Sequence, residues 1–386
     1  MTKPIYMDHA ATTPVDPEVV EAMLPYFREE YGNPASVHQW GQRAEHAVGS
    51  ARGQIARVLN CSKDEIIFTA CGSESDNLAL RGAALAARAS RRGNHLIVSA
   101  IEHPAVLSTA RQLRDQHGFE LTELPVDKYG LASPKDLSTA LRSDTVLVSI
   151  MYANNEIGVI APIAELAGAA HEQGAIFHTD AVQACSQLPM DVEALGVDML
   201  SLGAHKFYGP KGVGLLYARR GTVLQPAQTG GSQESGRRAG THNVPLIVGM
   251  AAALQLTAKR RKQDCSRMGA QRDRLIETVL RSVPSSRLTG HRTQRLPNNA
   301  SFIFAGIDGN ELLMHLDLAG VAASSGSACK TGSPEPSTVL RALGLSPRRA
   351  LGSLRLSIGR HTKSNDVEHT LSVLPNIIER MRATGD

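Results

Sequence analysis

A lysine, an aspartate and a histidine each stand at the end of a short apolar run of the sequence. Lys206 follows DMLSLG, Asp180 ends AIFHTD, and His103 follows HLIVSA. A lysine amine can form a Schiff base with an aldehyde cofactor, whose ring nitrogen then needs an acid as its partner. Taken singly, Asp180 would more often cap a helix, and a lone histidine such as His103 would more often be structural.

Gly72 and Ser73 follow the apolar run EIIFT at a plausible helix start. Free backbone N–H groups at a helix N-terminus favour a phosphate, although an ordinary helix cap explains this stretch equally well when it is taken alone. The chain has only 10 lysines against 31 arginines, which argues against Lys206 being one more surface lysine. Together, the lysine, the acid and the phosphate cradle describe pyridoxal 5′-phosphate, and no nucleotide-binding glycine motif supports a rival cofactor.

Cys329 lies within SSGSACKTGS (324–333), a run of small polar residues typical of a surface loop. No second cysteine is near enough in the sequence to suggest a disulfide. Lys330 follows it directly, and its charge would favour the thiolate if the two side chains approach each other.

The elements that must position these residues alternate between short β-branched runs and alanine- and leucine-rich helical segments. This alternation predicts an α/β fold with a mainly parallel sheet covered on both faces. Ligands of such sheets bind beyond the carboxyl ends of the strands. A long helical stretch (244–283) then leads to a second, smaller α/β unit. The expected strands of the first unit are 65–69, 95–100, 145–151, 175–180 and 198–203.

The composition is that of a globular protein with a large core. Of its 386 residues 42% are hydrophobic, and the net charge of +4 is too balanced to indicate a nucleic-acid partner. No apolar run has membrane-spanning length, and the polar start MTKPIYMDHA does not resemble a signal peptide. The five cysteines are scattered without a C-x-x-C pair, so neither a disulfide framework nor a zinc site is expected. We therefore expect a cytoplasmic protein.

In their order along the chain, the motifs resemble the NifS/IscS-type (group I) cysteine desulfurases of the class V aminotransferase family. This resemblance implies pyridoxal-phosphate fold type I, which is aspartate aminotransferase-like, with a mainly parallel seven-stranded sheet in the large domain and a smaller α/β C-terminal domain. It places the large domain at 16–258 and the small domain at 1–15 and 259–386, with the cysteine loop at about 324–337. The motifs are YMDHAATTPVDPEV, YGNPASVHQWG, EHPAV, NNEIGV, HTDAVQ, AHKFYGPKGVG, GGSQESGRRAGTHN, SSGSACKTGSPEPS and SLRLSIGRHT.

The activity implied by the resemblance converts L-cysteine to L-alanine and carries the sulfur as a persulfide on Cys329. A sulfur-acceptor protein would receive it for iron–sulfur cluster assembly or thiolation, because a loop of small residues can move between cofactor and acceptor. The resemblance also implies a homodimer without a resident metal, although Cys329 could transiently ligate an iron–sulfur cluster. Two alternatives stay open: another fold-type-I aminotransferase or lyase that does not use Cys329, and a non-catalytic partner-binding paralogue.

The resemblance further assigns roles to individual residues. Cys329, Lys206 and His103 would be catalytic, with Lys206 also holding the cofactor and His103 stacking on its ring. Arg355 and, as a second candidate, Asn33 would bind the substrate carboxylate, which a planar guanidinium can grip through two bonds. Gly203 stands where the family often has a phosphate-binding serine. The other cofactor contacts would come from Asp180, Gln183, Asn155, Gly72, Ser73, His205 and Thr241, the last reaching into the site of a second subunit.

Overall fold

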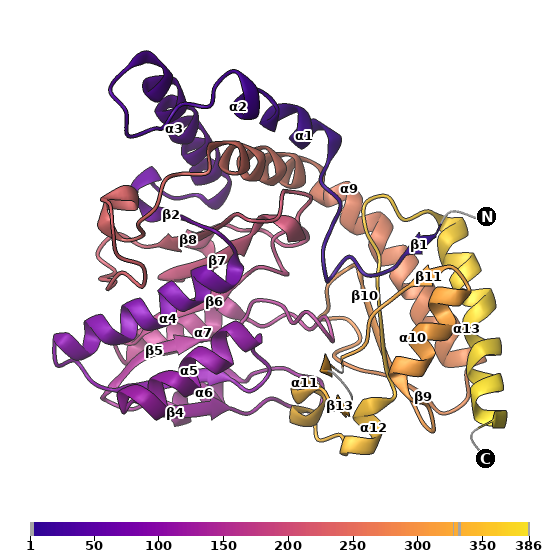
Figure 1. Cartoon of the computed structure of the whole chain (residues 1–386). Coiled ribbons are helices and arrows are strands. Elements are labelled where there is room, and N and C mark those ends of the chain that lie inside the picture. The colour runs from indigo at the N-terminus through magenta and orange to yellow at the C-terminus, as the bar shows by residue number, and fades with distance from the viewer. Residues whose placement is uncertain (1–3, 327, 331–332, 385–386) are drawn as a thin grey trace.

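A seven-stranded sheet forms the centre of the larger part of the molecule (Figure 1). The computed structural model describes residues 4–326, 328–330 and 333–384, and at 328–330, 333–335 and 384 it describes the backbone alone. Strand β8 is antiparallel to both its neighbours and the other adjacent pairs are parallel, as expected for a mainly parallel sheet. Across the sheet the order is β2 (Ile66–Thr69), β8 (Gly214–Ala218), β7 (Met199–Gly203), β6 (Ile176–Asp180), β5 (Thr145–Ser149), β3 (His95–Ser99) and β4 (Glu120–Leu124).

Helices cover both faces of this sheet because alternate strand residues are apolar on each side. Leu147 and Met199 pack under α4 and α5, whereas Val148 and Phe177 face the opposite helices. The first face is covered by α4 (Gly72–Ala89) and α5 (Pro104–His117). The second is covered by α3 (Gln39–Leu59), α6 (Pro134–Ala140), α7 (Ile163–Glu172), α8 (Val192–Leu195) and the first half of α9 (Val244–Ser282).

A smaller α/β part follows α9, which runs between the two parts in Figure 1. Its three antiparallel strands lie in the order β14, β10, β9, and Phe302 and Leu354 lie in a separate apolar core. The N-terminal strand β1 pairs with β11 of this part, and Met7 enters the same core. The elements are β1 (Ile5–Tyr6), β9 (Ser286–Leu288), β10 (Asn299–Phe304), α10 (Gly309–Leu318), β11 (Val321–Ala322), α11 (Thr338–Ala342), α12 (Pro347–Leu351), β14 (Ser353–Ser357) and α13 (Ser364–Thr384).

The predicted strands and the long helix are confirmed to within two residues at their ends, whereas β4 and β8 were not expected from the sequence. The expected cysteine loop contains two short paired strands, β12 (Ala328–Lys330) and β13 (Ser333–Glu335). Two short helices, α1 (Pro17–Met23) and α2 (Pro25–Arg28), precede α3. The domain limits 16–258, 1–15 and 259–386 stay a prediction. Within the described residues, we find no helix with the length and apolar character to span a membrane.

Candidate active site

Lys206 lies in a single 3₁₀ turn (Ala204–Lys206) that directly follows β7. Its Nζ atom donates to the backbone oxygens of Ala10 and Ala11, at 2.6 and 2.7 Å. Burial, and then the positive charge of Arg355, lower the pKa of Lys206 to about 8. An amine with such a pKa is far more often neutral near pH 7–8 than a surface lysine is, which suits a nucleophile.

The N-terminal segment holds this lysine in place, a role that the sequence did not reveal. Gln183 Nε2 donates to the same Ala10 oxygen at 2.6 Å, so Lys206 and Gln183 converge on one atom. Thr13 Oγ1 donates to the backbone oxygen of His205 at 2.9 Å, which fixes the segment beside the 3₁₀ turn. The only signal available in advance was the motif YMDHAATTPVDPEV, which carries the resemblance but assigns no role to Ala10 or Thr13.

Asp180 and His103 lie near the lysine, as their positions after strands predicted. Burial raises the pKa of Asp180, while the Val182 N–H at 2.9 Å and the charges of His103 and Lys206 act in the opposite direction. His103 caps α5, and its Nδ1 accepts from Ala105 N at 3.1 Å. Burial lowers the pKa of His103, and a neutral ring that accepts at Nδ1 carries its proton on Nε2.

The N-terminus of α4 lies where the phosphate cradle is predicted, and its role stays a prediction. Helix α4 begins at Gly72, and a Cβ atom added at Gly203 would lie 3.3 Å from Gly72 N, so the two glycines face each other closely. The Nδ1 atom of His205 lies 3.2 Å from Thr12 Oγ1, and the predicted contact of His205 with the phosphate stays a prediction. Burial and the charges of Lys206 and Lys211 lower the pKa of His205 to about 4, which leaves its ring neutral.

Arg355 lies on β14 of the smaller part of the molecule and contacts residues near Lys206 in the larger part. Its Nη2 donates to Asp8 Oδ1 at 2.8 Å and its Nη1 to the backbone oxygen of Asn155 at 2.9 Å. Its buried Nε has no hydrogen-bond partner among the described residues. A substrate carboxylate would therefore meet a guanidinium already oriented by Asp8, a residue without a role in the sequence-based prediction.

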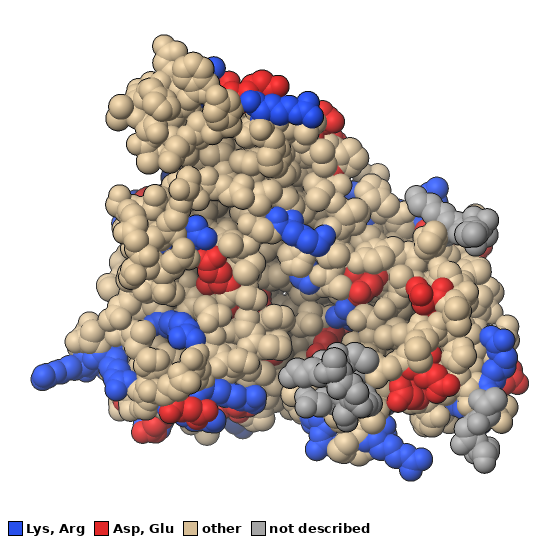
Figure 2. All heavy atoms as spheres, viewed as in Figure 1, with Lys and Arg blue, Asp and Glu red and all other residues tan. Residues whose placement is uncertain are grey.

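The cysteine loop begins and ends against the same group of residues. Ser324 and Arg355 exchange backbone hydrogen bonds of 3.3 and 2.7 Å. At the other end, Ser337 Oγ donates to Glu156 Oε2 at 2.5 Å. The side chain of Cys329 lies outside the described residues, so its predicted role is untested. Figure 2 shows this face hollowed where the two parts meet, with acidic and basic side chains around the hollow.

Asn33 and Thr241 lie elsewhere on the chain. They line a separate hollow of about 320 Å³ that also includes Arg52 and His242, and none of its lining residues belongs to the Lys206 group. Within one chain, therefore, the structure does not bring Asn33 to Arg355 or Thr241 to Gly72. Their predicted roles stay predictions.

The segment that carries Thr241 is fixed by Glu234, a residue without a role in the sequence-based prediction. Glu234 is buried with a left-handed backbone (φ 48°), and its carboxylate accepts from Arg52, from His242 Nε2 at 2.6 Å and from Phe68 N at 3.1 Å. Burial alone would raise its pKa, but these bonds and the charges of His242 and Arg52 lower it to about 2. A glycine-rich stretch is thus held by a buried ion pair.

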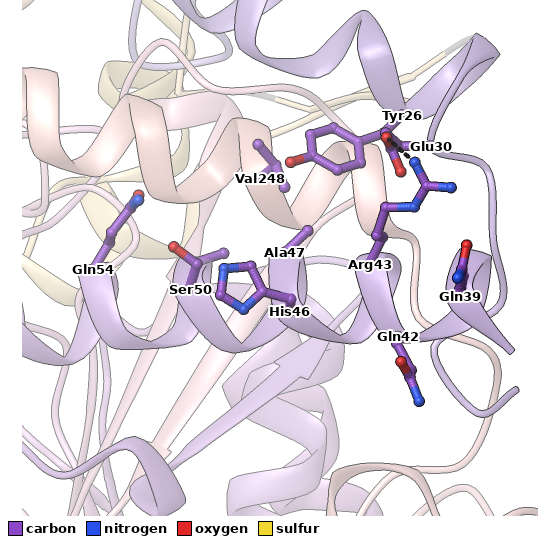
Figure 3. Close-up of a pocket in the computed structure, with 11 residues that line it drawn as sticks. Tyr26, Glu30, Gln39, Gln42, Arg43, His46, Ala47, Ser50, Gln54 and Val248 are labelled. Atoms are coloured by element: carbon purple, nitrogen blue, oxygen red, sulfur yellow. Dashed lines mark hydrogen bonds and ion pairs between the residues drawn. The ribbon is translucent and has the colours of Figure 1, made fainter. Parts of the chain in front are cut away.

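A further hollow of about 700 Å³ lies between α2, α3 and α9 (Figure 3). Tyr26, His46 and Gln54 line it, and the ion pair of Arg43 with Glu30 lies at one end. None of the residues that line it belongs to the predicted active site.

The residues that are brought together fit pyridoxal phosphate. Lys206 is a buried amine with a lowered pKa, Asp180 is a buried carboxylate whose charge Lys206 favours, and an 18-residue helix starts beside them at Gly72. These are the partners that an aldehyde, a ring nitrogen and a phosphate require.

Comparison with known proteins agrees with this geometry. Residues 5–370 match the aminotransferase class-V family, and the chain belongs to this family of pyridoxal-phosphate-dependent enzymes. The cysteine desulfurase IscS of Dictyoglomus turgidum is 48% identical over 382 residues, covering 99% of this chain and 96% of that protein. A solved NifS-like protein has 35% identity and a TM-score of 0.91, covering 98% and 100% of the two chains. The structure described as SspA in complex with cysteine has 36% identity and a TM-score of 0.81, covering 93% and 99%.

Proposed function

We propose that the protein is a pyridoxal-phosphate-dependent cysteine desulfurase, which converts L-cysteine to L-alanine and holds the sulfur as a persulfide on Cys329. The observation that carries this proposal is the buried Lys206 amine beside Asp180 and His103, with the cysteine loop starting from a backbone pair with Arg355. The similarity to IscS and to NifS-like structures supports it.

Each residue of this group has a task that follows from its chemistry. Lys206 would bind the cofactor's aldehyde carbon and later move a proton, Asp180 would accept a hydrogen bond from the protonated ring nitrogen, and the α4 N-terminus would bind the phosphate. When bound, pyridoxal phosphate draws electrons from the carbon atoms of the substrate. His103, with its proton on Nε2, would present an N–H rather than a positive charge.

Sulfur transfer needs Arg355 and Cys329. Arg355 would orient the substrate through its carboxylate, and the Cys329 thiolate would attack the substrate sulfur. An S–S bond forms while the Cβ–S bond of the substrate breaks, and protonation of the remaining carbon gives alanine. An acceptor protein would then take the outer sulfur, for cluster assembly or thiolation.

Two variants test this function. Lys206→Ala should leave the purified protein colourless and release no alanine from cysteine. Cys329→Ser should still change the cofactor's absorbance on mixing with cysteine but release little alanine, because a serine hydroxyl is a poor nucleophile toward sulfur at neutral pH. Alanine production by Cys329→Ser at the unmodified rate would instead favour a lyase or aminotransferase that does not use the loop.

We also propose a homodimer in which Thr241, and Asn33 with it, complete the site of the second copy. Support comes from apolar side chains that are exposed near Asn33 in the sequence, including Phe27 (57% exposed), Tyr31 (69%) and Val37 (90%). Large apolar groups gathered on one surface commonly mark an interface. The division into domains at 16–258 and 1–15 with 259–386 is part of the same proposal.

A further inference from the structure

The two ends of the cysteine loop meet at one side chain, that of Glu156. Ser337 Oγ donates to Glu156 Oε2 at 2.5 Å. Gly326 lies against the same oxygen, because a Cβ atom added at Gly326 would be 2.5 Å from Glu156 Oε2 and 3.2 Å from Ser337 Cβ. Residues 326 and 337 are therefore neighbours in space, whatever path the chain takes between them.

The backbone of the turn that carries Glu156 does not depend on this carboxylate. Asn154 Oδ1 accepts from Glu156 N and from Ile157 N, at 2.9 Å each. Asn299 Nδ2 donates to the backbone oxygen of Glu156 at 3.1 Å. Within the described residues, Ser337 is the only hydrogen-bond partner of the Glu156 side chain. The turn is thus complete without the carboxylate, whose contacts go to the cysteine loop.

The smaller part of the molecule holds the same two ends through other bonds. Ser337 caps α11, and its Oγ accepts from Leu340 N at 3.1 Å, which leaves the hydroxyl hydrogen for Glu156. Gly326 N donates to Ser353 Oγ at 3.1 Å. Glu156 therefore joins both ends of the loop to the turn 154–158.

Glu156 directly follows the residue that orients Arg355. Arg355 Nη1 donates to the backbone oxygen of Asn155 at 2.9 Å, so adjacent residues contact the proposed substrate-binding arginine and the loop. Burial raises the pKa of Glu156 to about 7, against the bond from Ser337 and the charge of Arg355, which lower it. At pH 8 the side chain is therefore mainly a carboxylate, the form that accepts the stronger hydrogen bond.

We propose that Glu156 is a positioning residue, which holds the two ends of the cysteine loop, Gly326 and Ser337, in a fixed place relative to Arg355. This inference rests on the proposed function, in which Cys329 of the loop attacks a substrate bound at Arg355. Without the Glu156 carboxylate the two ends would separate more easily. Cys329 would then meet the substrate sulfur less often, while the cofactor and the substrate would still bind.

The first measurement follows the loop itself and is made on the protein as purified. Lys330 lies between the two ends, so a lysine-specific protease at pH 8, with cleavage after Lys330 followed by mass spectrometry, reports how readily this part of the chain opens. Glu156→Ala should speed this cleavage roughly tenfold, because a hydrogen bond to a charged group is lost. Ser337→Asp should also speed it, since it keeps a helix cap but places a second carboxylate beside Glu156, and it serves if Glu156→Ala does not fold.

The double variant Glu156→Gln with Ser337→Asp exchanges donor and acceptor. The amide introduced at 156 can donate to the carboxylate introduced at 337, so cleavage should return to within about threefold of the unmodified rate. Glu65→Gln is the matched control, because Glu65 is a buried carboxylate in the turn before β2 that accepts from Ser62 N and Arg220 N, at 2.8 Å each. It should leave the cleavage after Lys330 unchanged.

The second measurement is the reaction with cysteine. Glu156→Ala should change the cofactor's absorbance at the unmodified half-saturating concentration of cysteine but release alanine roughly tenfold more slowly. The double variant should regain most of the rate, whereas a structural defect alone would not be repaired by exchanging donor and acceptor.

Unchanged cleavage in both Glu156→Ala and Ser337→Asp would overturn the inference. So would equal acceleration in Glu65→Gln, or a double variant that is cleaved as fast as Ser337→Asp. If the unmodified protein releases no alanine from cysteine, the proposed function fails, whereas the cleavage rates still decide whether Glu156 holds the loop.

Discussion

The surroundings of Lys206 lower the pKa of its amine and so make it a better nucleophile. An amine in water has a pKa near 10.5, whereas burial and the Arg355 guanidinium bring that of Lys206 to about 8. The sign of this shift is clear: both a low-dielectric site and a nearby cation disfavour the protonated form. The lysine therefore becomes a nucleophile above about pH 8 instead of above pH 10.5.

The rate at which the cofactor-free protein takes up pyridoxal phosphate should follow this pKa. We expect the rate to rise with pH and level off above about 8, as measured by the growth of the bound cofactor's absorbance. Arg355→Gln removes a cation and leaves Asp8 unpaired, so the midpoint should move upward by up to roughly one unit. Arg349→Gln, an exposed charge loss on α12, is the control and should leave the midpoint in place. A midpoint near 10 in the unmodified protein would contradict this account.

Gly203 lies beside the proposed phosphate site and offers it no hydroxyl. A Cβ atom there would lie 3.3 Å from Gly72 N and 3.6 Å from Val182 Cγ1, so the Gly72 backbone has to shift by a few tenths of an ångström. Gly203→Ser should therefore slow the loss of pyridoxal phosphate during dialysis, since a bond to a charged group contributes roughly 1.5–3 kcal/mol. Gly203→Ala, which adds the same Cβ without the hydroxyl, separates the hydrogen bond from the steric effect. Faster loss from the serine variant than from the alanine variant would show that position 203 does not face the phosphate.

At the scale of elements, the strand ends were predictable and the contacts across the chain were not. Lys206, Asp180 and His103 each follow an apolar run, and the ends of parallel strands meet at one edge of a sheet. Asp8, Ala10 and Glu234 act only because distant segments fold against them, and nothing in their local sequence reports that. The α4 N-terminus was visible from the glycine that opens it.

The bonds of Glu234 with Arg52 and His242 hold the glycine-rich segment 228–243 in place. The Glu234 carboxylate has a pKa of about 2 in the folded chain and an ordinary pKa near 4.5 when unfolded. A carboxylate whose pKa is depressed by folding stabilises the folded state at pH values above about 4.5, and this stabilisation is lost as the pH falls toward 2. By linkage, that stability is about 3 kcal/mol.

Glu234→Gln should lower the melting temperature at pH 7 and make residues 228–243 susceptible to proteolysis, because Arg52 loses its buried partner. The difference from the unmodified protein should narrow as the pH falls below 4.5. Glu30→Gln breaks the more exposed ion pair with Arg43 and should cost less than about 1 kcal/mol. Equal effects of the two substitutions would refute the role assigned to Glu234.

At the scale of the whole molecule, α1, α2 and the start of α3 lie at one end and α10 lies at the other (Figure 1). Exposed apolar side chains occur in residues 20–40 at the first end, and Leu318 (85% exposed) lies on α10. Phe27→Asp combined with Val37→Asp should convert a dimer into monomers without unfolding them, since neither side chain is buried within one chain. Light scattering measures the mass, and cofactor content should fall in parallel if Thr241 serves the second copy. Leu318→Asp is the control and should remain dimeric. Monomeric unmodified protein with full activity would rule out a shared site.

The backbone hydrogen bonds between Ser324 and Arg355 also limit how far Cys329 can move. Cys329 is five positions beyond Ser324 and eight positions before Ser337, which is bonded to Glu156. An extended chain spans at most about 3.4 Å per residue, so while these bonds hold, the Cα atom of Cys329 stays within roughly 17 Å of Ser324 and roughly 27 Å of Ser337, whatever path the chain takes. A sulfur carried on Cys329 would therefore be on a short tether, and an acceptor would have to bring its receiving atom to within a side chain's length of the overlap of those two spheres. A protein whose receiving thiol lies deep in a cleft narrower than this loop could bind the enzyme and still receive nothing.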